Sequence, residues 1–208
     1  TASLPGTDVV LVLGPEPALR WRGFCEQLTS IADRFEVPMA FTLGALLADV
    51  PHSRPTQIIG TATDAALIER FDLERSRYEG PTGIVGVLHD ALSRHGLPTA
   101  SLWAAVPGYA AQLPSPRAAA ALLERLSSMM GTPAPTAALA AEFDDYDAKV
   151  ASAISDDEDM ATYVSRLEAM VDEMNDDEED DEPMGVDDPD PERLAAEVER
   201  FLRNQDGD

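Results

Sequence analysis

Short aliphatic runs alternate with amphipathic segments along the first 130 residues. The runs predict strands at 9–13, 39–43, 57–60 and 100–106, and three of the five residues of the first run are β-branched. Between and after them, apolar residues recur every three or four positions and predict helices over 19–35, 65–71, 84–92 and 116–129. Strands that alternate with helices at this spacing predict an α/β fold with a largely parallel sheet.

The remaining residues predict amphipathic helices. One helical face contains Leu139, Phe143, Tyr146, Val150 and Ile154, and a second contains Met160, Tyr163, Leu167, Met170, Val171 and Met174. Ser155 and Glu158 have the spacing of a capping box for the second helix. An uninterrupted run of acids follows at 176–182, and a last short helix presents Leu194, Val198, Phe201 and Leu202 on one face.

Charge separates these two parts of the chain, whose net charge is −24. Residues 1–141 have 10 Arg and no Lys against 13 acids, a net of −3, whereas residues 142–208 have a net of −21. We therefore expect four regions: an α/β core lacking an upstream N-terminal portion (1–141), an amphipathic helical extension (142–175), an acidic flexible linker (176–190) and a short C-terminal helix (191–208). The acidic part disfavours nucleic acid and anionic membranes as partners. It favours solubility, or attraction to a basic protein surface.

The cysteine content and the hydropathy pattern favour a cytoplasmic protein. Cys25 is the single cysteine, so no intramolecular disulfide can form, and its apolar neighbours predict a buried thiol. The sequence contains no apolar run of about 18 residues and no recognisable signal peptide.

The sequence contains no familiar catalytic or metal-binding motif. The Walker loop, the dinucleotide-binding glycine pattern, the serine elbow and the zinc-protease pattern are all missing. His52, His89 and His95 are scattered, and zinc needs three or four convergent ligands. We therefore predict no catalytic residues, no bound cofactor and no metal site.

Two glycine-containing loops precede helices and offer backbone N–H groups to an anion. They are 60–64, with the sequence Gly-Thr-Ala-Thr-Asp, and 80–83, with the sequence Gly-Pro-Thr-Gly. Capping of the following helix by Thr63 or Asp64 is the favoured alternative for the first loop, since Thr and Asp are preferred at that position.

Several phrases, in order, resemble the proteasome assembly chaperone 2 family in its actinobacterial form. They are Gly14–Pro17 with Trp21 and Phe24, Thr42–His52, Gly60–Ala62, Tyr78–His89 and Ala100–Pro107. The resemblance implies a three-layer α/β/α sandwich like that of the purine nucleoside phosphorylases. It also implies a further stretch of strands and helices upstream, and a non-catalytic role in assembling the proteasome α-ring. Gly108 departs from the family pattern, which has a histidine before Tyr109, and residues 204–208 lack the hydrophobic–Tyr–any-residue ending of some relatives.

Two classes of function remain open on these grounds. The favoured one is a non-enzymatic, assembly-chaperone-like or interaction protein that self-associates and binds proteasome subunits or another basic-surfaced protein. The alternative is an enzyme or binding protein for a nucleoside-type or nucleotide-type small molecule, with its site at the carboxyl ends of the strands. The alternative requires five polar side chains to converge on one pocket: Glu16, Thr42, Thr61, Asp64 and Tyr109.

Overall fold

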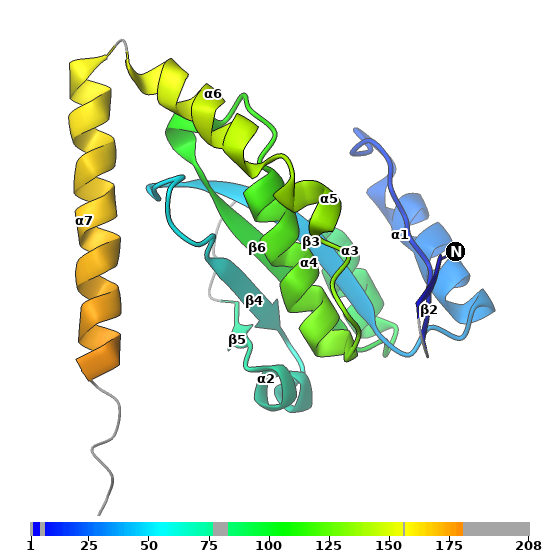
Figure 1. The fold of residues 1–208 in the computed structure, drawn as a ribbon. Helices are drawn as coiled ribbons and strands as arrows, with labels where there is room; N and C mark the ends of the chain where they lie inside the picture. The colour runs from blue at the N-terminus through cyan, green and yellow to red at the C-terminus, as the bar shows by residue number, and fades with distance from the viewer. Residues whose placement is uncertain (1, 5–6, 77–82, 156, 181–208) are drawn as a thin grey trace, which may run out of the picture. The chain divides into compact units, whose positions relative to one another are not determined.

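A four-stranded mixed sheet lies at the centre of the fold (Figure 1). The computed structural model describes residues 2–4, 7–76, 83–155 and 157–180, and the chain divides into two compact units, Thr1–Glu168 and Ala169–Asp208. In spatial order the strands of the sheet are β3 (Ala40–Ala48), β6 (Thr99–Pro107), β4 (Ile58–Ala62) and β5 (Glu74–Arg75). A separate antiparallel hairpin pairs β1 (Ala2–Leu4) with β2 (Thr7–Val9).

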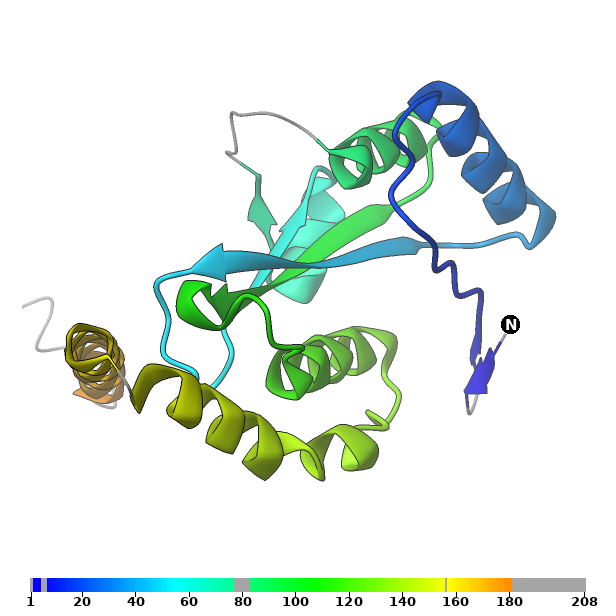
Figure 2. The same ribbon diagram turned by 90° about the horizontal axis from the view of Figure 1, so that it is seen from above.

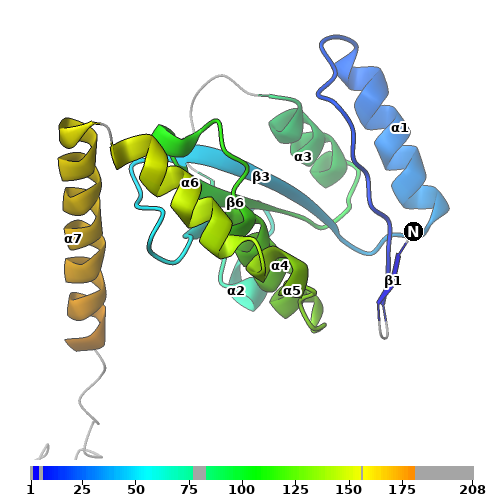
Figure 3. The same cartoon turned by 45° about the horizontal axis from the view of Figure 1, so that its top comes forward.

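Helices cover both faces of the sheet, which makes the predicted three-layer α/β/α arrangement (Figure 2). On one face lies α3 (Ile84–Arg94), with α1 (Trp21–Arg34) packed beside it, as Figure 3 also shows. On the other face lies α4 (Pro116–Met130), against which α5 (Ala137–Ala140) and α6 (Phe143–Ser155) pack. The remaining helices are α2 (Ala65–Phe71), a 3₁₀ turn η1 (Gly108–Ala110) and α7 (Glu158–Asp180).

The sheet is mixed rather than largely parallel, which corrects the expectation from sequence. β3 and β6 are parallel, with Ala40 opposite Thr99, but β4 runs antiparallel to β6. The reason lies in residues 49–57, which join β3 to β4 without a helix. A parallel neighbour needs a long crossover connection, whereas a loop without one returns the chain antiparallel.

The segment 9–13, predicted to be a strand buried on both faces, is neither a full strand nor buried. β2 ends at Val9, and Leu11, Val12 and Leu13 are 73%, 60% and 101% exposed. An aliphatic run becomes a buried strand only when neighbouring strands pair with it and a layer covers it. No strand among the described residues pairs with residues 10–13.

The main core lies between the sheet and α4. Leu102 of β6 is fully buried there, and Met129 of α4 packs in the same cluster. Two predicted caps start the helices on this side: Ser115 Oγ accepts from Ala118 N at 3.1 Å, and Asp64 Oδ1 accepts from Ala66 N at 2.7 Å. Cys25 is buried as expected, and burial raises the pKa of its thiol.

The first helix of the acidic extension packs onto the α/β layers. Tyr146 and Val150 of α6 are 4% and 0% exposed and form a cluster with Ala110. Arg117 of α4 reaches Asp147 of α6 with Nε at 2.9 Å from Oδ1, and this guanidinium lowers the pKa of the Asp147 carboxyl. The compact unit therefore continues past residue 141, the predicted end of the core.

The second amphipathic helix is α7, and its cap differs from the one expected. Asp157 Oδ1 accepts from the backbone N of Asp159 and Met160 at 3.0 Å, while Ser155 Oγ donates to Ser152 O. Asp157 takes the role because it directly precedes the first helical residue, where a side-chain oxygen reaches the free N–H groups. Residues 176–180, expected to begin a flexible linker, are the end of α7. The expected helix at 191–208 lies outside the described residues, among which no helix is long and apolar enough to cross a membrane.

Candidate functional site

A row of hydroxyl groups crosses three neighbouring strands beneath α3. Ser101 of β6 stands opposite Thr42 of β3 on one side and opposite Thr61 of β4 on the other. Thr42 Oγ1 and Ser101 Oγ are 2.5 Å apart, and Ser101 Oγ lies 3.2 Å from Nδ1 of His89 on α3. The pKa of His89 is lowered by burial. The row thus brings together two of the five candidate residues, Thr42 and Thr61.

This hydroxyl–imidazole contact was not anticipated from the sequence, because Ser101 and His89 belong to different elements. A serine beside a histidine is the start of a nucleophile–base pair. Ser101, however, is 6% exposed, and its oxygen already contacts both Thr42 and His89. The contacts therefore join α3 to the sheet, which is a structural role for these polar groups.

Glu16 and Asp64 each serve the start of a helix. Glu16 Oε1 accepts from the backbone N of Ile84, the first residue of α3, at 3.3 Å. The N-terminus of α3, which the sequence offered as a place for an anion, therefore already binds a carboxylate of the chain itself. Asp64 caps α2, the favoured alternative for its loop, and Thr63 Oγ1 lies 2.9 Å from Ser93 Oγ.

Tyr109 lies at the opposite end of the sheet from Asp64. Asp64 follows the carboxyl end of β4, and Tyr109 follows the carboxyl end of β6. Because these two strands are antiparallel, their carboxyl ends point in opposite directions. The five candidate residues therefore do not converge on one pocket, and the strand direction that separates them was not evident from the sequence.

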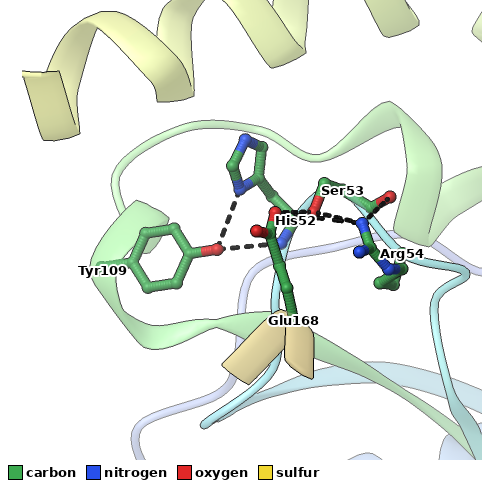
Figure 4. A network of polar contacts seen from close by, with 5 residues as sticks. All are labelled: His52, Ser53, Arg54, Tyr109 and Glu168. Atoms are coloured by element: carbon green, nitrogen blue, oxygen red, sulfur yellow. Dashed lines mark hydrogen bonds and ion pairs between the residues drawn. The ribbon is translucent and has the colours of Figure 1, made fainter. Parts of the chain in front are cut away.

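Tyr109 instead forms a polar cluster with the loop after β3 (Figure 4). Its hydroxyl oxygen accepts from the backbone N of His52 at 2.8 Å and lies 2.9 Å from Nδ1 of the same residue. A hydroxyl can accept from the backbone and still donate its own proton, so Tyr109 can donate to Nδ1 of a neutral imidazole. Burial lowers the pKa of His52 and raises that of Tyr109 to about 12.

Side chains of the same loop bind the first half of α7. Ser53 Oγ donates to Glu168 Oε1, and Arg54 Nη1 lies 3.9 Å from the same oxygen. Tyr163 Oη donates to Asp49 Oδ1 at 2.7 Å, and its ring meets the ring of Tyr109 edge to face. None of these partners was predicted from sequence, since they are more than 50 positions apart along the chain.

We expect His52 to titrate below the ordinary histidine pKa of 6.5. Its folded-state pKa is depressed, so its contribution to stability is present above the ordinary pKa and is lost as the pH falls through the folded value. Tyr109→Phe removes the hydroxyl that can donate to Nδ1 of the neutral imidazole. This change is expected to raise the pKa of His52. NMR titration of the imidazole measures this, with Tyr163→Phe as the matched control because its hydroxyl bonds Asp49 instead. Identical titrations in wild type and Tyr109→Phe would contradict the proposed hydrogen bond.

None of the five candidate residues lines either of two surface depressions in the described part of the chain. One is lined by Asp33, Glu36 and His95, where His95 Nε2 lies 2.8 Å from Asp33 Oδ1. The other is lined by Arg70 and Arg125, and Arg125 Nη2 donates to the carbonyl oxygen of Phe71 at 2.6 Å. No group of three or more potential metal ligands occurs among the residues described.

β3 exposes apolar side chains and has one edge that no described strand pairs with. In the described chain β3 pairs with β6 alone, and Leu43 and Leu47 are 43% and 62% exposed. The nine residues of β3 include no charge and no proline, which are the usual protections of an edge strand. The exposed leucines of β3 and its unpaired edge are a candidate interaction surface; we call Leu43, Leu47 and this edge the β3-edge surface.

Comparisons with known proteins agree with this fold. The model of the PAC2 family matches residues 1–154. A PAC2 family protein from Streptomyces avermitilis is 41% identical, with a TM-score of 0.63 over 73% of this chain and 63% of its own. A proteasome-assembly chaperone homologue from Mycobacterium tuberculosis is 42% identical, with a TM-score of 0.67 over 77% of this chain and 69% of its own. The chain thus spans about two thirds of the length of these relatives, and no protein of curated function matches it.

Proposed function

Because the chain belongs to the PAC2 family, we propose that it is a non-enzymatic, assembly-chaperone-like protein that binds subunits of the proteasome. The observation that carries the proposal is its 42% identity to a protein described as a proteasome-assembly chaperone homologue. We further propose that it acts in the cytoplasm and self-associates.

Two features of the structure support an interaction role: the hydrogen bonds of the polar candidate residues and the exposure of apolar side chains on β3. Thr42, Asp64 and Tyr109 each make hydrogen bonds that join elements of the fold, and they do not face a common pocket. The β3-edge surface, in contrast, exposes leucines on a strand that pairs on one edge only within the described part of the chain. Such a surface suits protein contacts, because apolar area and free backbone groups gain from being covered by another chain. The enzyme alternative lacks the convergence that it requires.

Reconstitution of proteasome assembly tests the proposal. Purified α- and β-subunits of the Mycobacterium tuberculosis proteasome would be mixed with and without this protein and followed on native gels. We expect the protein to migrate with an α-subunit intermediate and to speed the appearance of the assembled particle several-fold.

The double substitution Leu43→Asp with Leu47→Asp should remove this effect if the β3-edge surface makes the contact. Glu26→Gln, at an exposed position of α1, is the control. An assembly rate unchanged by excess wild-type protein, together with no co-migration with any subunit, would overturn the proposed function.

A further inference from the structure

A surface depression lies where α2 and α4 end, and two arginines line it. Its lining consists of residues 70–72 from the end of α2, together with Arg125 and residues 128–131 from the end of α4. Its volume is about 480 Å³, within the range of about 300–1,000 Å³ that is common for small-ligand sites. All of these residues belong to the first compact unit, Thr1–Glu168. The depression is separate from the β3-edge surface, with which it shares no residue.

The end of α2 holds Arg125 in place. Its Nη2 donates to the carbonyl oxygen of Phe71 at 2.6 Å and to that of Asp72 at 3.1 Å, and the residue is half-buried. These acceptors are carbonyls that a helix leaves without partners where it ends. A guanidinium has five N–H donors, and within the described residues Nε and Nη1 of Arg125 make no hydrogen bond. The group is therefore fixed in position and keeps donors for a ligand.

Arg70 supplies a second guanidinium that lacks a carboxylate partner. Its Cζ lies 4.7 Å from the centre of the Phe71 ring. Among the residues that the structure describes, neither Arg70 nor Arg125 forms an ion pair, whereas Arg94 and Arg117 each pair with an acid. The chain has 39 acids against 15 Lys and Arg, so two arginines without an acid in one depression depart from its general charge pattern. Like charges that share a site repel each other, and an anion bound to both offsets this repulsion.

The remaining lining residues decide which anion fits. The carboxylate of Asp72 offsets one of the two arginine charges, which leaves a net charge of about +1 for a ligand to meet. Phe71, Met129 and Met130 contribute apolar side chains. A phosphate dianion would bring more negative charge than the site neutralises, whereas a carboxylate brings a single charge. The two oxygens of a carboxylate also match the planar fork of a guanidinium.

We propose that this depression binds a carboxylate that carries an apolar group. The carboxylate lies against the remaining N–H groups of Arg125 and the guanidinium of Arg70, and the apolar group lies on Phe71 and Met130. A small organic acid and the C-terminus of a peptide share this chemistry. The proposal is independent of the proteasome link, so its failure would leave the proposed function standing.

Titration of the full chain with hexanoate, and with an acetylated tetrapeptide that ends in two leucines, distinguishes the two sources. NMR is expected to show backbone amide shifts of residues 70–72 and 128–131 that saturate near the millimolar range, as suits so few contacts. The same peptide with a C-terminal amide should not bind, because it lacks the charge that the arginines meet.

Substitutions test the two charges separately. Arg70→Gln should weaken binding about fivefold or more. Asp72→Asn should strengthen it several-fold, because it removes a repelling carboxylate, and Asn tolerates the positive φ of 49° at this position. The matched control is Arg34→Gln, which removes an exposed arginine from α1 and should leave the affinity unchanged.

Saturation with hexanoate would support a small organic acid as the ligand, and saturation with the peptide alone would support a chain terminus. Absence of saturable shifts with both ligands would overturn the proposal. Equal affinity for the acid and amide forms of the peptide would overturn it too, because apolar contact would then account for binding. The same holds for equal affinity in wild type and Arg70→Gln, since Arg70 is exposed and circular dichroism of the variant should match wild type.

Discussion

Val150→Asp is expected to lower the free energy of unfolding by about 3–5 kcal/mol, because it leaves an unpaired charge in a buried site. Val150 is fully buried in a cluster with Ala110 and Tyr146. Urea unfolding followed by far-UV circular dichroism measures the loss. The result matters because Val150 lies beyond residue 141, the predicted end of the α/β core.

Ala151→Asp is the matched control, since Ala151 is the next residue of α6 and is exposed. It adds the same charge to the same helix and is expected to change stability by less than about 0.5 kcal/mol. Equal losses for the two variants would mean that α6 is not part of the folded core. In that case truncation after Ala141 should leave a cooperatively melting domain, as the division at 141 predicts.

Leu102→Ala is expected to cost about 2–5 kcal/mol, the range for a buried leucine that leaves a cavity. Leu102 lies at the centre of β6 with no exposed surface. Leu47→Ala, in β3, makes the same chemical change at a position that is 62% exposed. It is expected to cost less than about 0.5 kcal/mol.

The contrast between the two leucines also tests the β3-edge surface in the isolated protein. If Leu47→Ala costs as much as Leu102→Ala, another chain covers Leu47 under the conditions of the measurement. The loss should then depend on protein concentration, because association contributes to stability by mass action. A large loss that does not change with concentration would contradict the exposed placement of Leu47.

Helices and their caps were largely evident from the sequence. The helix predicted over 65–71 is α2, and Ser115 and Asp64 cap the helices that they were expected to start. These features depend on side-chain spacing within a few turns and on one side chain that reaches a nearby N–H, so local sequence is enough to predict them. The cap of α7 was misassigned to Ser155 because Asp157 offers an equivalent oxygen closer to the helix.

The candidate site was less accessible to prediction. Thr42, Ser101 and Thr61 meet only because three strands lie in a particular order and register. Tyr109 meets His52 and Tyr163 only because a loop and a distant helix pack at the same place. Polar residues within aliphatic strands, such as Ser101, were a visible signal, but the sequence does not state which of them become neighbours.

Periodicity and composition along the chain were sufficient to establish an α/β protein with an acidic helical extension, because they reflect how each segment distributes its apolar side chains. The tertiary structure decided the antiparallel direction of β4, the exposure of Leu11–Leu13 and the burial of Tyr146 and Val150. These depend on which segments become neighbours. Pairing and burial are properties of two segments at once, and contacts between distant parts of the chain are set by the packing of the whole fold.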